Sequence, residues 1–398
     1  MSAAVDKAAD SLAVLESTIQ TTLSLIATFQ TSIVPQPPAP ATEDTSETKD
    51  QDPKSKSKSK NHDAINALDL AHDVAKLIKA HSTKISLLII NKPFTPTAIN
   101  TVLRELVAGP LPGLASAVEL CDGAAYTKVM SAELQWRAKR VFAELATLLK
   151  AIPLDGKILT EDQKNGTGNT AGKGSLVSTG VVWEACDSVV ELKITGVAGL
   201  LIQKAELYRD LVKDALEELQ EWAAEGSDDE DEPDLEAAYE NEVGNEAQDA
   251  VDNLFGSQKH IPKDDPDKIR ERLDSTTKRL RLMALMYQAV IKRRFRTLPA
   301  LPHPELPIKI KEKSSEDPGI VECLDTLLDR LKKIPDDIDE LANAFYELDG
   351  EQIDQKMDQC FFLGFAAVEL LLKNWEGEKD EFTTWVSPAS VLLARMPY

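Results

Sequence analysis

The sequence predicts an all-α protein built as two antiparallel helical bundles in series, joined through one long helix. Apolar residues recur every three or four positions along most of the chain, which is the period of amphipathic helices. The periodic segments are long and are separated by turns rich in Pro or Gly, and long helices joined by short turns pack as antiparallel neighbours. The one strand-like run, residues 85–90, has no partner strand nearby. We expect an N-terminal bundle over residues 1–192 and a C-terminal bundle over residues 193–398.

The first helix ends at Pro35 and is followed by a segment with almost no large apolar side chain. That segment, residues 35–60, cannot bury enough surface to offset its chain entropy, so we predict a disordered insertion. Its Lys/Ser tract at 54–60 matches a weak nuclear-import signal, although a solubilising tract is the commoner role of such sequences. The apolar stripe of the helix itself comprises Leu12, Leu15, Ile19, Leu23, Ile26 and Phe29.

Helical periodicity resumes after His62 and continues through the run at 85–90, which we assign to the last turns of that helix. Thr95 and Pro96 predict the start of the next helix, because Thr can act as an N-cap and Pro at the first helical position loses no hydrogen bond. Pro110 and Pro112 then predict a kink or a break. The residues expected to face inward are Ile65, Leu68, Ala71, Val74, Leu77 and Ile78, followed by Ile99, Val102, Leu103 and Leu106.

A helix over residues 131–152 precedes a polar, Gly-rich segment at 155–174 that we predict to be a flexible loop. The loop lacks the spacing of a phosphate-binding loop and follows no strand. The long helix at 175–226 carries a row of apolar residues spaced by seven, wide enough for the core face of a bundle. That row is Ile194, Leu201, Tyr208, Ala215 and Trp222, flanked by Val197, Leu200, Leu207, Leu211 and Leu219.

Composition then becomes strongly acidic over residues 225–234, which we interpret as a solvated linker. Acidic residues follow Ser227 at the next three positions, a pattern that suits an acid-directed kinase, so Ser227 is a candidate phosphorylation site. A Pro-rich connector at 297–317 leads to further helices. The LxxLL-like run at Leu324, Leu327 and Leu328 is interpreted as core, since such spacing is common on any buried helix face.

One helix, from Lys268 to Arg296, is strongly basic. Its buried side is predicted from Leu273, Leu280, Met283, Met286, Tyr287, Val290 and Ile291. We expect its charges to pair with acidic neighbours in the same protein, for which the acidic run at 228–234 is a candidate. Its tip is the candidate docking site for an acidic partner and consists of Lys292, Arg293, Arg294 and Arg296.

The charge balance and the motifs disfavour several function classes. A formal net charge of −22 over 398 residues repels a phosphate backbone, so direct nucleic-acid binding is not expected. The five histidines lack the spacing of a metal site, no catalytic motif is present, and the four cysteines are widely separated. We therefore predict a protein that is not an enzyme, with no cofactor, metal or small-molecule substrate. No uninterrupted apolar run is long enough to predict membrane insertion.

The order of these segments resembles the Grap2 and cyclin-D-interacting protein family, also called GCIP-like. The resemblance lies in four segments. Three are in the first part of the chain: "KISLLIINKPFTPTAINTVLRELVAG", the following "LQWRAKRVFAELATLLKAI", and the acidic break after "LEELQEW". The fourth, in the C-terminal part, is "DKIRERLDSTTKRLRLMALMYQAVIKRRF". The resemblance implies two helical bundles like those of talin- and vinculin-type proteins. It also implies cell-cycle or transcriptional regulation by binding D-type cyclins and helix-loop-helix factors without binding DNA.

We therefore expect an adaptor of the cytoplasm and nucleus that acts through cyclin-type or helix-loop-helix partners. The alternative is a cytoskeletal adaptor whose bundles bind filaments or membrane-linked proteins.

Overall fold

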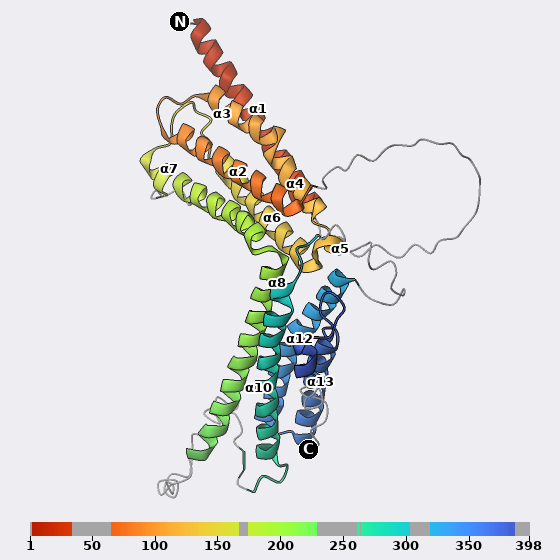
Figure 1. The fold of residues 1–398 in the computed structure, drawn as a ribbon. Coiled ribbons are helices and arrows are strands. Elements are labelled where there is room, and N and C mark those ends of the chain that lie inside the picture. The colour runs from red at the N-terminus through yellow and green to blue at the C-terminus, as the bar shows by residue number, and fades with distance from the viewer. Residues whose placement is uncertain are drawn as a thin grey trace, which may run out of the picture. The chain divides into compact units, whose positions relative to one another are not determined.

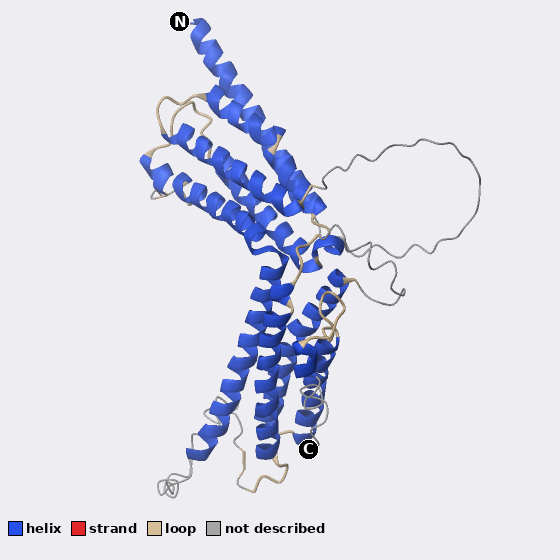
Figure 2. Cartoon of the chain, viewed as in Figure 1, coloured by secondary structure: helices blue, strands red, loops and turns tan. Residues whose placement is uncertain are grey.

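All regular elements in the described part of the chain are helices. The computed structural model describes residues 2–33, 65–166, 174–228, 261–262, 264–302 and 319–386. Within those ranges no strand occurs (Figure 2), which confirms the all-α prediction. The predicted disordered insertion at 35–60 lies outside the described residues, as do 229–234 of the predicted linker and 303–317 of the predicted connector.

The chain divides into two compact units, residues 1–197 and 198–398 (Figure 1). The division falls within helix α8 (Ser175–Asp228), whose backbone leaves the helical conformation at Gly196 with φ 61° and ψ −177°. Such a conformation is essentially restricted to glycine, because a Cβ atom would clash there. The domain bounds predicted from the sequence stay predictions, as does the likeness to talin- and vinculin-type bundles.

The N-terminal unit is built from α1 (Ser2–Ser32), α2 (Ala67–Ile90), α3 (Pro96–Ala108), α4 (Pro110–Leu120), α5 (Gly123–Tyr126), α6 (Lys128–Lys150), α7 (Glu161–Asn165) and the first half of α8. Helix α1 packs against α3 and α6, and α2 packs against α3 and α4. Two ion pairs join α8 to α2 and α6. Lys79 of α2 pairs with Asp187 at 2.7 Å, and Arg140 of α6 pairs with Glu184 at 2.8 Å.

Helix α1 contains a segment that meets the length and composition criteria for crossing a membrane. That segment is Asp10–Ser32, and 22% of the residues in its apolar 18-residue window are buried within the unit. A core helix passes the same test, and Leu15, Ile19 and Ile26 of α1 are buried against the neighbouring helices. This segment is the one such candidate among the described residues.

Helix α2 begins later than the sequence pattern suggested. Asn66 caps it by accepting hydrogen bonds from the backbone N–H groups of Leu68 and Asp69, as a side-chain amide does at a helix start. Ile65 therefore precedes the helix and is 69% exposed, while Leu77 is 50% exposed on its outer side, so both were wrongly predicted as inward-facing. The run at 85–90 is helical, as predicted.

The break between α3 and α4 falls at Gly109, as the proline pattern indicated. Helix α3 begins at Pro96, but Thr95 does not cap it; its hydroxyl donates to the Pro93 carbonyl at 3.2 Å instead. The four inward-facing residues predicted on α3 are all buried, which confirms that part of the prediction: Ile99, Val102, Leu103 and Leu106.

The predicted loop at 155–174 contains the short helix α7. Thr160 and Gln163 form a capping box, in which each side chain bonds the other residue's backbone, and this arrangement is a known signal for a helix start. Leu159 anchors the segment: it is buried, and its N–H donates to the Ile89 carbonyl at 2.9 Å. Residues 167–173 lie outside the described residues.

The C-terminal unit contains the second half of α8, α10 (Ile269–Arg293), the 3₁₀ turn η1 (Phe295–Thr297), α12 (Ile320–Glu347), α13 (Gly350–Glu369) and a short helical segment at 381–386. Helix α13 packs against both α12 and α10. All residues predicted on the buried side of α10 are buried, and Leu324, Leu327 and Leu328 lie in the core as predicted.

Helix α12 keeps its course through Pro335 because another helix satisfies the carbonyl that the proline leaves open. Pro335 has no N–H to donate to Leu331, four residues earlier. The buried Tyr287 hydroxyl of α10 donates to that carbonyl at 2.6 Å instead. Burial also raises the pKa of Tyr287, so this hydroxyl remains a donor at neutral pH.

The apolar row predicted along α8 is only partly buried. Leu201, Ala215 and Trp222 are buried, but Ile194 is 79% exposed. The prediction assumed one helical phase along the whole segment, and the break at Gly196 changes that phase. Two of the predicted flanking residues, Leu207 and Leu211, are also exposed.

Candidate docking site at the end of helix α10

The basic tip of α10 presents some of its charges to solvent and buries one. Lys292, Arg293 and Arg296 are exposed, whereas Arg294 and the neighbouring Phe295 are fully buried. Helix α10 ends at Arg293, because the backbone of Arg294 leaves the helical conformation with φ −120° and ψ −58°. The 3₁₀ turn η1 begins at the next residue, Phe295. Because the chain turns here, consecutive basic residues point in different directions.

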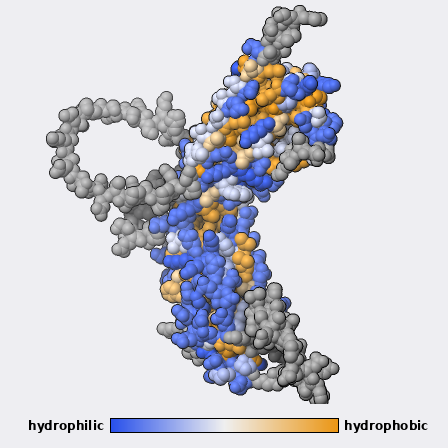
Figure 3. Space-filling model, turned by 180° about the vertical axis from the view of Figure 1, so that it is seen from behind, coloured by the Kyte–Doolittle hydropathy of each residue, from blue (hydrophilic) through white to orange (hydrophobic). Residues whose placement is uncertain are grey.

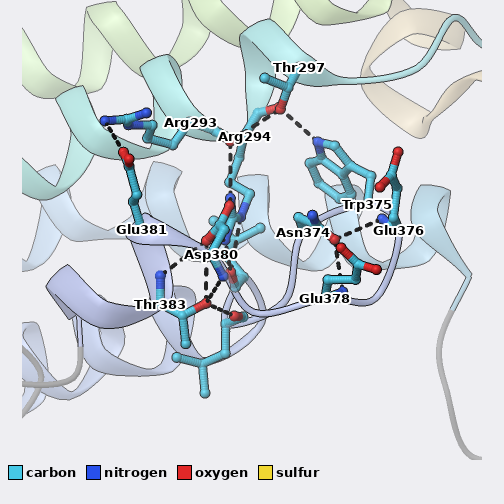
Figure 4. Close-up of polar contacts among 12 residues, drawn as sticks. Arg293, Arg294, Thr297, Asn374, Trp375, Glu376, Glu378, Asp380, Glu381 and Thr383 are labelled. Atoms are coloured by element: carbon cyan, nitrogen blue, oxygen red, sulfur yellow. Dashed lines mark hydrogen bonds and ion pairs between the residues drawn. The ribbon is translucent and has the colours of Figure 1, made fainter.

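Arg294 binds the segment that follows α13 (Figure 4). Its guanidinium donates to both carboxylate oxygens of Asp380, at 2.7 and 3.0 Å, and donates twice more to the Leu371 carbonyl. The same guanidinium lies 4.3 Å from the centre of the Phe382 ring, a cation–π distance. A planar fork of donors suits a bidentate carboxylate pair, so Arg294 holds this corner of the fold together.

Hydrogen bonds within the segment after α13 hold its backbone in position beside Arg294. Asp380 and Thr383 cap the helical turn at 381–386, because the Thr383 N–H donates to Asp380 Oδ1 at 3.2 Å and the Asp380 N–H donates to Thr383 Oγ1 at 3.1 Å. Asn374 closes the preceding turn by accepting from the N–H groups of Glu376 and Glu378. Trp375 then donates its indole N–H to the Arg294 carbonyl at 2.8 Å.

The ion pair strongly favours the charged form of Asp380. The hydrogen bonds from Arg294, helped by those from Thr383, lower the pKa of Asp380 from 3.8 to about 2. The carboxylate therefore stays ionised at neutral pH and keeps the buried guanidinium neutralised.

Arg294 is consequently a structural residue, and its inclusion among the docking residues was wrong. A buried guanidinium already bonded to a carboxylate and a carbonyl cannot reach a partner. Arg293 pairs with Glu381 at 2.7 Å, but both side chains are exposed, and such a pair exchanges partners at little cost. The docking prediction is thus limited to Lys292, Arg293 and Arg296.

Part of the expected pairing of the basic helix occurs, with partners later in the chain, while residues 229–234 of the suggested acidic partner lie outside the described residues. Besides Asp380 and Glu381, Asp354 of α13 accepts a bidentate pair from Arg272 at 2.7 and 2.8 Å. The acidic cap pattern at 380–383 was the one signal in the sequence that could have indicated a partner for Arg294.

The remaining candidate residues do not converge. No group of three metal-ligating side chains occurs in the described residues. The four cysteines are free, and burial raises the pKa of Cys121 and Cys186 to about 12, so those two thiols are not nucleophiles at neutral pH. Ser227 lies at the end of α8, but its side chain is outside what the structure describes, and its phosphorylation stays a prediction.

A comparison with known protein families finds a match, which runs from within α2 to near the end of α8. Residues 71–225 match the family model described as Grap2 and cyclin-D-interacting, N-terminal. Over residues 71–225 the chain is similar to the GCIP family. The resemblance seen in the sequence is thereby confirmed. The GCIP match ends at residue 225, so it does not include the basic tip of α10 at residues 292–296.

A protein of Schizosaccharomyces pombe described as uncharacterized is also similar to this chain. It is 23% identical over 329 residues, which cover 80% of this chain and 82% of that protein. The similarity therefore extends well beyond the GCIP-matched region.

Proposed function

We propose that this protein is a non-enzymatic helical adaptor that regulates the cell cycle or transcription by binding a cyclin-type or helix-loop-helix protein. The GCIP-family match supports a protein-binding role, because the family is described as cyclin-D-interacting. We place its action in the cytoplasm and nucleus. The docking site is proposed at the tip of α10 because Lys292, Arg293 and Arg296 are basic and exposed there.

The tip is suited to an acidic partner for an electrostatic reason. The protein carries a net charge of −22, so a cluster of exposed positive side chains contrasts with the field of the whole molecule. Rim charges of this kind steer association and suppress wrong partners more than they add affinity. The ion pair between the buried Arg294 and Asp380 holds the end of α10 in place, which reduces the entropy cost of presenting Lys292 and Arg296.

The test compares two charge-reversal variants of the full chain. K292E/R296E reverses the tip, and K278E/R281E applies the same change in charge to two other exposed positions of α10. Binding of a purified D-type cyclin and of a purified helix-loop-helix protein would be measured by biolayer interferometry at two salt concentrations. We expect the tip variant to weaken one of these interactions about ten-fold, mainly through a slower association rate, and the control variant to leave it within about two-fold.

Two results would overturn the proposal. Equal weakening by both variants would mean that only the overall charge matters. Absence of cyclin and helix-loop-helix binding, together with co-sedimentation with filamentous actin, would favour the cytoskeletal alternative.

A further inference from the structure

Two leucines on the second half of α8 are exposed although the helix is part of a packed unit. Leu207 is 54% exposed and Leu211 is 44% exposed. They are four residues apart, and Glu218 follows seven residues after Leu211, so all three lie along one side of the helix. Figure 3 shows that apolar patches interrupt a mostly hydrophilic surface in this unit.

Helix α12 lies beside this side of α8. The Tyr346 hydroxyl of α12 donates to Glu218 at 2.8 Å, and its ring packs edge-on against Trp222 at 5.4 Å. Nearer the start of this half of α8, burial raises the pKa of Tyr208, and the nearby carboxylates of Asp329 and Asp336 on α12 raise it further. The two helices therefore run alongside each other from about Tyr208 to Trp222.

The part of α12 that borders the leucines is acidic. Asp329, Asp336 and Asp339 are exposed, and Asp339 lies close enough to Asp336 and Glu218 to be affected by their charges. Lys332 and Lys333 are the exposed basic residues among these carboxylates. Exposed leucines thus lie next to carboxylates contributed by two helices.

We propose that this acidic and apolar face of α8 and α12 binds a basic amphipathic helix of a partner protein. A helix with leucines on one side could cover Leu207 and Leu211, because amphipathic helices bind through anchors spaced by three, four and seven residues. Its lysines or arginines would meet Asp336, Asp339 and Glu218. The face is opposite in charge to the tip of α10, so it selects a different partner from the one in the proposed function.

The test uses a defined probe because the natural partner is unidentified. A fluorescein-labelled synthetic peptide of about 20 residues, with Leu on one helical face and Lys on the other, would be titrated with the full chain, using fluorescence anisotropy. The matching Leu/Glu peptide reports binding that does not depend on charge. We expect the Leu/Lys peptide to bind and the Leu/Glu peptide not to bind.

Three variants locate the binding. D336K/D339K reverses the acidic border, and L207S/L211S removes the exposed apolar side chains without altering the core. E351K/D358K reverses two exposed carboxylates on a different helix, α13, and is the matched charge control. We expect about ten-fold weaker binding for each of the first two variants and less than about two-fold for the control. Circular dichroism and thermal melting would verify that each variant is folded.

Equal weakening by D336K/D339K and E351K/D358K would overturn the proposal, because it would indicate non-specific attraction to an anionic protein. Unchanged binding by L207S/L211S would also overturn it. So would a concentration-dependent dimer that L207S/L211S abolishes, since a second copy of the chain would then cover this face.

Discussion

Replacing Asp380 with Asn tests how the end of α10 is held. Asn keeps the size of the side chain and remains a good helix N-cap, so the turn at 381–386 retains its cap. The change removes the negative charge that neutralises Arg294, a guanidinium with no exposed surface. It therefore isolates the ion pair from the other roles of the residue.

The expected loss follows from the pKa of Asp380. A shift from 3.8 to about 2 corresponds to about 2.4 kcal/mol at 1.36 kcal/mol per unit. Asp380 is 33% exposed, and solvent screening reduces that value to roughly 1–1.5 kcal/mol. Leaving a buried guanidinium without its carboxylate adds to the cost. We expect D380N to lower the free energy of unfolding by about 2 kcal/mol at neutral pH, or a Tm by about 4–8 °C for a unit of this size.

The effect should depend on pH in one direction. The folded-state pKa of Asp380 lies below its unfolded value, so the stabilisation is present above the unfolded pKa of about 4 and is lost as pH falls from there towards 2. The difference between wild type and D380N should therefore be constant from about pH 8 to pH 5 and fall to about half by pH 3.

Urea denaturation followed by far-UV circular dichroism, at several pH values, would measure this difference. The matched control is E381Q, which removes the neighbouring but exposed partner of Arg293 and should cost less than about 0.5 kcal/mol. A loss below about 0.5 kcal/mol for D380N at neutral pH, or a difference that does not change on acidification, would refute the reasoning.

Two further predictions concern the backbone. Y287F should destabilise the chain by about 1–3 kcal/mol, because it leaves the Leu331 carbonyl without a donor. In a P335A background the new N–H at position 335 can donate to that carbonyl, so urea titration should give a smaller loss for Y287F. An equal loss in both backgrounds would contradict this account. G196A should cost about 1–3 kcal/mol by thermal melting, because φ is 61° there. G180A, at an exposed helical glycine with free space for a Cβ, should instead be neutral or stabilising by up to about 1 kcal/mol; similar effects of the two changes would contradict the assigned backbone conformation.

Sequence periodicity alone was sufficient to predict the helical class and much of the core. The inward side of α3 and that of α10 were predicted correctly because each helix keeps one phase from end to end, and apolar spacing then identifies a single buried face. Proline and glycine gave the break between α3 and α4 for a similarly local reason: they restrict or release the backbone at their own positions.

The failures occur where the outcome depends on residues far away in the chain. Arg294 and its neighbours Arg293 and Arg296 look alike in the sequence, and only Asp380, folded back beside α10, determines which of them is buried. Leu207 was predicted to flank the buried row that contains Leu201, yet Leu207 is exposed whereas Leu201 is buried. Hydrophobic spacing thus determined that helices form and which side they bury, whereas the partner of each charge and the coverage of each leucine were decided by packing between segments that the sequence does not place side by side.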